Sequence, residues 1–153
     1  MKVKVLKLND NAVVPFKTYD SDFCYDVVAT SCEEVAPNVY KYGTGLAFQI
    51  IRDKEDAGAS FKLSIDMRSR SSIWKTGMLL SNGVGTIDEN YRGEVCAVLY
   101  HVMPDMPKYE VGDKIAQIKI GISPSIEFEV VAELTSTDRG TCGYGSTGKQ
   151  HES

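Results

Sequence analysis

Phe61-Lys62-Leu63-Ser64-Ile65-Asp66-Met67-Arg68 is the stretch that decides the fold class. Apolar residues occupy every second position, and polar or charged residues fill the places between them. Because successive side chains of a β-strand point to opposite faces, this alternation predicts a strand with one buried face. An amphipathic helix needs apolar residues every three or four positions instead.

The rest of the chain continues in short segments of the same kind. Gly and Pro separate them, and no helical period lasts longer than a turn or two. Many short strands with frequent turns predict an all-β fold, as a sandwich, jelly roll or barrel. A short helix is expected at residues 71–77, capped by Ser71 or Ser72. Further strands are expected at the N-terminus around Val3 and Val5 and at residues 40–52, 95–102, 115–120 and 126–131.

Composition narrows the function. The net charge of −4 argues against nucleic-acid binding, which needs an excess of Lys and Arg. The N-terminus lacks the apolar core of a signal peptide, and no stretch is apolar enough to span a membrane. Four Cys without metal-ligand spacing fit a reducing, cytoplasmic setting. Only two His are present, so zinc or Ser-His-Asp chemistry has little material.

The last segment differs from the rest of the chain. Residues 135–153 are rich in Gly, Ser and Thr and offer almost nothing to bury. Such a segment is mobile unless it folds onto something. The expected division is a β-domain over residues 1–134 and a flexible arm over residues 135–153.

The central segment, residues 82–94, begins with Asn82-Gly83, a pair typical of a hairpin turn. Its string Asn-Gly-Val-Gly-Thr-Ile-Asp-Glu-Asn-Tyr-Arg-Gly-Glu closely resembles the third motif of the dUTPase family. Four further segments resemble the family's other motifs in the right order: residues 22–30, 67–73, 112–117 and 139–148. Five ordered motifs are far more specific than any one of them.

The resemblance implies a jelly-roll-like β-fold that assembles as a homotrimer with shared active sites. It implies an enzyme that hydrolyses dUTP to dUMP and pyrophosphate with Mg²⁺ as cofactor. Asp88 is then the general base that activates water, a role that suits a positioned carboxylate. Asp26 is then the residue that holds Mg²⁺ through water, as this cation prefers.

The resemblance also implies the residues that bind the substrate. Asn82 and the backbone from Gly83 to Ile87 would recognise uracil, and Tyr91 would stack under the deoxyribose. Arg139 would clamp the γ-phosphate with its planar fork, and Tyr144 would stack over uracil. The full set of substrate-binding residues is Arg70, Ser71, Ser72, Asn82, Gly83, Thr86, Ile87, Tyr91, Gln117, Arg139, Tyr144, Gly145, Ser146 and Thr147.

Two positions depart from the family pattern, and two further residues near the third motif are expected to have no part in catalysis. Lys114 stands where Arg is common, and Cys96 where a basic residue is frequent. Arg92 is expected to be a surface residue. Glu89 is expected to matter little, because it should point away from the face that carries Asp88.

Two alternatives stay open. A dCTP deaminase shares the fold, but it relies on a Glu in the strand after Gly93, and residues 95–99 contain no carboxylate. A dUTPase-like module that mainly engages a regulatory partner is the second alternative. An assay of several nucleotides separates these alternatives from a dUTPase.

Overall fold

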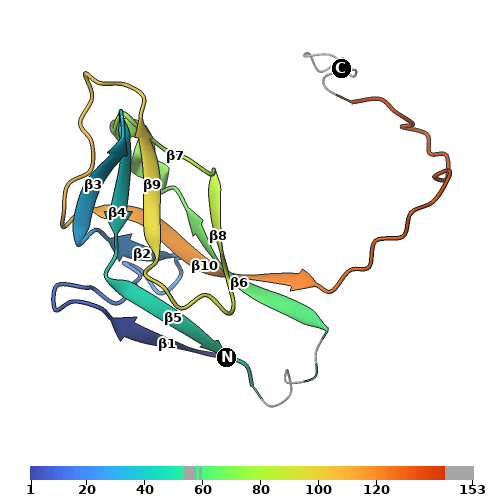
Figure 1. Cartoon of the computed structure of the whole chain (residues 1–153), viewed down its shortest axis with the longest axis horizontal. Coiled ribbons are helices and arrows are strands. Elements are labelled where there is room, and N and C mark those ends of the chain that lie inside the picture. Colours follow the sequence, from blue (N-terminus) through green and yellow to red (C-terminus); the bar gives the residue numbers. More distant parts are fainter. Residues whose placement is uncertain (54–57, 59, 144–153) are drawn as a thin grey trace.

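The computed structural model describes residues 1–53, 58 and 60–143, and this part of the chain is all-β (Figure 1). No helix within those ranges is long and apolar enough to cross a bilayer. The strands are β1 (Lys2–Lys7), β2 (Tyr25–Val28), β3 (Ser31–Ala36), β4 (Val39–Gly43), β5 (Leu46–Ile51), β6 (Phe61–Arg68), β7 (Met78–Leu80), β8 (Val84–Asp88), β9 (Cys96–His101) and β10 (Lys114–Pro124).

The strands form two four-stranded sheets and one two-stranded sheet. One sheet has the order β2-β10-β6-β8, the second has the order β3-β4-β9-β7, and β1 pairs with β5. All of these pairings are antiparallel. Apart from β3 and β4, paired strands are not consecutive in the chain, as in a jelly-roll-like fold, so the expected all-β class is confirmed.

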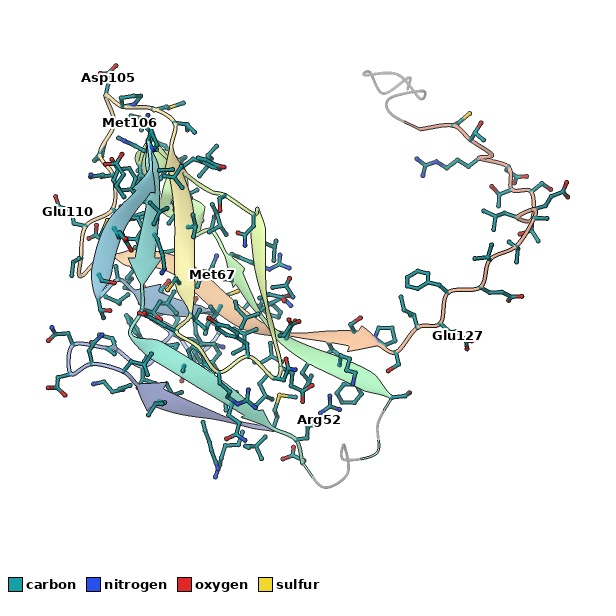
Figure 2. All side chains as sticks on the ribbon, viewed as in Figure 1. Arg52, Met67, Asp105, Met106, Glu110 and Glu127 are labelled. Carbon is teal, nitrogen blue, oxygen red and sulfur yellow. The ribbon has the colours of Figure 1, made fainter. Side chains whose placement is uncertain are left out.

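The core confirms the alternation of the opening stretch. Leu63, Ile65 and Met67 of β6 are buried, and the residues between them face the other side of the sheet. They pack in one cluster with buried residues of the second sheet, including Tyr42 and Leu99. Met67 lies between the sheets (Figure 2). The core therefore joins both four-stranded sheets into one unit.

The expected strand over residues 40–52 is divided in two. β4 ends at Gly43 and β5 begins at Leu46, with Gly45 between them at a φ of 66°. Glycine adopts this left-handed conformation without the steric cost that other residues meet. The bend lets β4 join one sheet while β5 leaves it to pair with β1.

The hairpin expected at Asn82-Gly83 is wrong. The turn connects β7 to β8, but β7 pairs with β9 and β8 pairs with β6, so the chain crosses between sheets here. Gly83 has a φ of 64°, which agrees with the tight turn that its sequence predicted. The sequence therefore predicted the turn itself. It did not predict which strands pair on either side of the turn, because pairing depends on residues that are distant in sequence.

The short helix expected at residues 71–77 is a 3₁₀ helix, η2 (Ser71–Lys75). Its cap was assigned wrongly. Arg70 occupies the N-cap position, and no side chain makes a capping hydrogen bond. The guanidinium of Arg70 is directed to a carboxylate instead, as described below.

The strand expected over residues 126–131 is also wrong for the single chain. β10 ends at Pro124, and the chain then runs away from the sheets without a partner strand (Figure 1). Phe128 is 89% exposed and Val130 is fully exposed. The segment has the period of a strand, but none of the described strands pairs with it. The division at residue 135 stays a prediction.

Candidate active site

Two hollows gather most of the described candidate residues. The first, the Asp88 pocket, has a volume of about 400 Å³. It lies where β8 ends and the following loop returns towards β9. Its lining residues are Lys41, Thr86, Ile87, Asp88, Tyr91, Glu94, Val95 and Cys96.

Backbone pairing fixes the position of Asp88. It is the last residue of β8 and lies opposite Ser64 of β6. A turn follows, closed by the Tyr91 amide, which donates to the Asp88 carbonyl oxygen at 3.0 Å. The turn returns Tyr91 to the same pocket, where its hydroxyl donates to the Glu94 carbonyl oxygen at 3.3 Å. A carboxylate and an exposed aromatic ring thus line one hollow.

The second hollow, the Asp26 pocket, has a volume of about 470 Å³. Strand register brings its polar side chains together, because Gln117 of β10 lies opposite Asp26 of β2 on one side and Arg68 of β6 on the other. The side-chain amide of Gln117 donates through Nε2 to the Ser69 carbonyl oxygen at 2.8 Å. The lining residues are Lys17, Thr18, Tyr19, Asp22, Phe23, Cys24, Asp26, Arg70, Ser71 and Gln117.

Asp26 is held between two cations. Arg70 Nε donates to one carboxylate oxygen at 2.9 Å, and Lys114 Nζ lies 3.0 Å from the other. The Asp26 side chain is only 15% exposed. Arg70 also donates through Nη1 to Ser72 Oγ at 3.3 Å. With Lys17 and Asp22 of the lining included, three cations face two carboxylates, and this positive excess suits an anionic ligand such as phosphate.

Lys114 has a larger part here than the sequence predicted. The sequence assigned it no role, yet it pairs directly with Asp26, and its ammonium lies 4.8 Å from the centre of the Phe16 ring. A Lys gives a point charge where an Arg would give a planar fork, so this position contributes charge more than orientation.

The described residues fit one kind of magnesium site. Among them, no group of three or more His, Cys, Asp or Glu side chains is placed to hold a metal ion. A protein-only cage is therefore absent from the described part of the chain. Two carboxylates, Asp22 and Asp26, line the hollow, and so few protein ligands fit a Mg²⁺ ion that keeps its waters and is held mainly by substrate phosphates.

Other expected site residues lie outside these hollows. Asn82 does not line either of them, and its side chain lies over Gly85, where an added Cβ would come within 3.1 Å of the amide nitrogen. Arg139 is exposed on the arm, and its Nε donates to the Cys142 carbonyl oxygen at 2.9 Å. Tyr144, Gly145, Ser146 and Thr147 lie outside the described residues.

Arg92 follows the Asp88–Tyr91 turn, and Cys96 lines the same pocket. Arg92 is exposed, as expected, and its Nη1 also donates to the carbonyl oxygens of Glu89 and Tyr91, each at 2.8 Å. Backbone partners leave no signal in a sequence pattern. Cys96 lines the Asp88 pocket, and burial raises the pKa of its thiol, which favours the neutral form. A thiol cannot supply the positive charge that a basic residue would bring there.

Comparison with known proteins gives the family. The family model described as dUTPase matches residues 10–148. A deoxyuridine 5'-triphosphate nucleotidohydrolase of Clostridium novyi is 36% identical over 150 residues, covering 97% of this chain and 99% of that protein. Another, of Nautilia profundicola, is 34% identical over 151 residues, covering 97% of this chain and 100% of that protein.

The solved structures agree on the fold. Staphylococcus bacteriophage 80alpha dUTPase with dUpNHpp superposes with a TM-score of 0.75 at 23% identity, covering 97% of this chain and 99% of that chain. The family match spans nearly the whole chain, including β2, β6, β8 and β10, the strands that carry the two pockets. The chain belongs to the dUTPase family.

Proposed function

We propose that the chain is a dUTP diphosphatase that hydrolyses dUTP to dUMP and pyrophosphate. The observation that carries the proposal is the placement of Asp88 and Tyr91 at the two ends of one turn in a single pocket. The relatives that match over nearly their full length are named deoxyuridine 5'-triphosphate nucleotidohydrolases, which supports this substrate. In a cell this activity limits uracil in DNA and supplies dUMP for thymidylate synthesis.

In the proposed reaction, Asp88 accepts a proton from a water molecule as the water oxygen attacks the α-phosphorus. The bond from the α-phosphorus to the bridging oxygen breaks, and pyrophosphate leaves with the electron pair. A positioned general base contributes roughly 10²–10⁴-fold to such a step. Tyr91 packs against the deoxyribose, and the segment from Asn82 to Ile87, with Gly83 and Thr86, recognises uracil.

The triphosphate is assigned to the Asp26 pocket. Arg70, Ser71 and Gln117 line this pocket, and the charge beside Asp26 favours an anion. These three residues, with Ser72, which accepts a hydrogen bond from Arg70, are assigned as donors to the phosphate oxygens. Mg²⁺ is assigned to Asp26 through water and would neutralise phosphate charge when bound. A solved structure of a mutant phage phi11 dUTPase concerns a structural Mg(II) ion, which shows that one family member binds this metal.

The enzyme is proposed to act as a homotrimer with shared active sites. The Asp88 pocket and the Asp26 pocket have no lining residue in common, so base recognition and phosphate binding are separated on one chain. The segment between β10 and the arm that carries Arg139 leaves the sheets and exposes large apolar side chains (Figure 2). In a trimer, the Asp88 pocket of one chain could face the Asp26 pocket of a neighbouring chain, and that neighbour could also cover the exposed apolar segment. This arrangement accounts for the separate pockets and for the exposed side chains. A cytoplasmic location is part of the same proposal.

The alternatives are weaker. No carboxylate lies within residues 95–99, and the Glu94 carboxylate accepts the Gly45 amide at 2.7 Å as a structural contact. This arrangement does not favour a deaminase. A regulatory role is recorded for phage dUTPases, which control transfer of virulence genes. Such a role would add to hydrolysis here, since Asp88 and Tyr91 are in place.

The test is pyrophosphate release from dUTP, dCTP, dTTP and UTP under identical conditions with Mg²⁺. A site that hydrogen-bonds a defined base edge discriminates by about 10⁴-fold against analogues that mismatch it. We therefore expect dUTP to be strongly preferred over the other three. Comparable turnover of dUTP and dCTP would overturn the proposal.

A further inference from the structure

The turn that follows β8 carries both groups assigned to the chemistry. It is closed by the hydrogen bond from the Tyr91 amide to the Asp88 carbonyl oxygen. Any tilt of this turn would therefore move the proposed base and the aromatic ring together. Glu89 and Asn90 lie between Asp88 and Tyr91, so their contacts can fix the turn relative to the sheets.

Glu89 makes a two-pronged ion pair with a residue distant in sequence. Arg52 Nε donates to Glu89 Oε1 at 2.8 Å, and Arg52 Nη2 donates to Oε2 at 2.7 Å. The two side chains are 21% and 27% exposed. Parallel hydrogen bonds between a guanidinium and a carboxylate fix orientation as well as distance. The pair therefore restrains the turn far more than a single surface contact would.

The same two side chains reach the backbone of β6. Arg52 Nη2 donates to the Phe61 carbonyl oxygen at 2.9 Å, and the Leu63 amide donates to Glu89 Oε2 at 3.3 Å. The Arg52 guanidinium lies 4.8 Å from the centre of the Phe61 ring. Since β6 is the strand that pairs with β8, the residue after Asp88 is tied to the strand on which Asp88 is registered.

Charge and location agree with a holding role. The hydrogen bonds from Arg52 lower the pKa of Glu89 to about 2, so its carboxylate stays ionised at neutral pH. Arg92 holds the other side of the turn through the Glu89 and Tyr91 carbonyl oxygens. Neither Arg52 nor Glu89 lines the Asp88 pocket, so neither is placed to touch substrate there.

We propose that Arg52 and Glu89 are positioning residues that hold the Asp88–Tyr91 turn in its reactive place. The inference rests on the proposed function of Asp88. The geometry of the Arg52–Glu89 ion pair is independent of that function. It replaces the expectation from the sequence that Glu89 matters little. Glu89 does leave the face of Asp88, but it uses the opposite face to anchor the turn.

The test uses Arg52→Lys, Glu89→Gln and the double variant. Arg52→Lys keeps the charge and loses the fork, and Glu89→Gln keeps the shape and loses the charge. We expect kcat to fall about tenfold to a hundredfold in each single variant, the scale seen when reacting groups are slightly misplaced. KM for dUTP should change less than kcat, because the phosphates bind in the other pocket and only the Tyr91 contact with the sugar moves with the turn. The double variant should fall no further, since the residues act as a unit.

The matched control is Glu34→Gln. Its carboxylate also accepts a backbone amide, that of Asn38 at 3.0 Å, but it lies on β3 in the other sheet. This variant should keep wild-type kcat. All variants are assayed below their melting temperatures, so a pair that only stabilised the fold would leave kcat unchanged.

Hydrogen exchange gives a readout that does not depend on activity. The Tyr91 amide should exchange faster in Glu89→Gln and in Arg52→Lys, while amides of the β4–β9 pair keep their rates. If wild-type protein failed to hydrolyse dUTP, the proposed function would fall and exchange would still decide whether the pair orders the turn. Unchanged Tyr91 exchange, or unchanged kcat, in the single variants overturns the positioning role. If Glu89→Gln does not fold, Arg52→Lys alone decides.

Discussion

Asp88→Asn is the sharpest test of the proposed chemistry. The substitution keeps the size of the side chain and removes its capacity to accept a proton. The bond that closes the turn runs to the Asp88 backbone carbonyl, so the side-chain change leaves it intact. Asp88 also forms no ion pair among the described residues. The variant should therefore fold as the wild type does and differ only in the reaction step.

The expected loss in kcat is roughly 10²–10⁴-fold, the range for a general base. At about 1.4 kcal/mol per factor of ten, this corresponds to about 3–5 kcal/mol of transition-state stabilisation. Binding of the imido analogue dUpNHpp should survive, because Arg70 and Ser71 line a pocket that Asp88 does not share. Removing a negative charge from the neighbourhood of a triphosphate should, if anything, tighten binding slightly.

The assays are pyrophosphate release for turnover and calorimetry with dUpNHpp for affinity. Asp105→Asn is the matched control, because Asp105 lies at the tip of the loop between β9 and β10 (Figure 2). It should keep both turnover and affinity. Loss of dUpNHpp binding in Asp88→Asn, or turnover within a factor of about two of wild type, would refute the assignment of Asp88 as general base.

Four further predictions concern the arm, the assembly, the core and pH. A chain cut before Arg139 should keep its circular-dichroism spectrum and melting temperature but lose turnover, because the described part of the removed segment is exposed. Light scattering should report a trimer, and a monomer active at the same concentration would contradict shared sites. Met67→Ala should lower the free energy of unfolding in urea by about 2–5 kcal/mol. The pKa of Glu89 lies at about 2, below its ordinary 4.5, so the stability that its ionised form contributes is full above pH 4.5 and is lost as pH falls towards 2. Urea unfolding of wild type and Glu89→Gln should therefore converge over that window.

The fold class and much of the site could be predicted from the sequence because they follow from local periods and ordered motifs. The alternation of β6 places Leu63 and Ile65 inside, as expected. Asp88 and Tyr91 share a pocket because a tight turn separates them by only three positions. Such short-range relations are fixed by strand and turn geometry alone.

Relations between distant segments could not be predicted in this way. The sequence indicated a turn at Asn82-Gly83, but not that it leads from one sheet to the other. Arg52 and Glu89 are 37 positions apart. Glu89 lies in the third motif, but none of the five motifs contains Arg52, so the sequence did not indicate their contact. Their contact depends on where β5 ends relative to β8, which only the sheet order determines.

The segment after β10, residues 126–131, has a sequence pattern whose predicted structure one chain alone does not form. Ile126, Phe128 and Val130 keep the period of two that buries the inward face of β6, yet all three are exposed. The period specifies a strand with an apolar face, and such a face is stable only against a partner surface. No strand of the described chain pairs with this segment. The prediction of a strand was therefore wrong for the single chain, while the pattern that prompted it favours a partner chain. The separation of the Asp88 pocket from the Asp26 pocket also favours a partner chain.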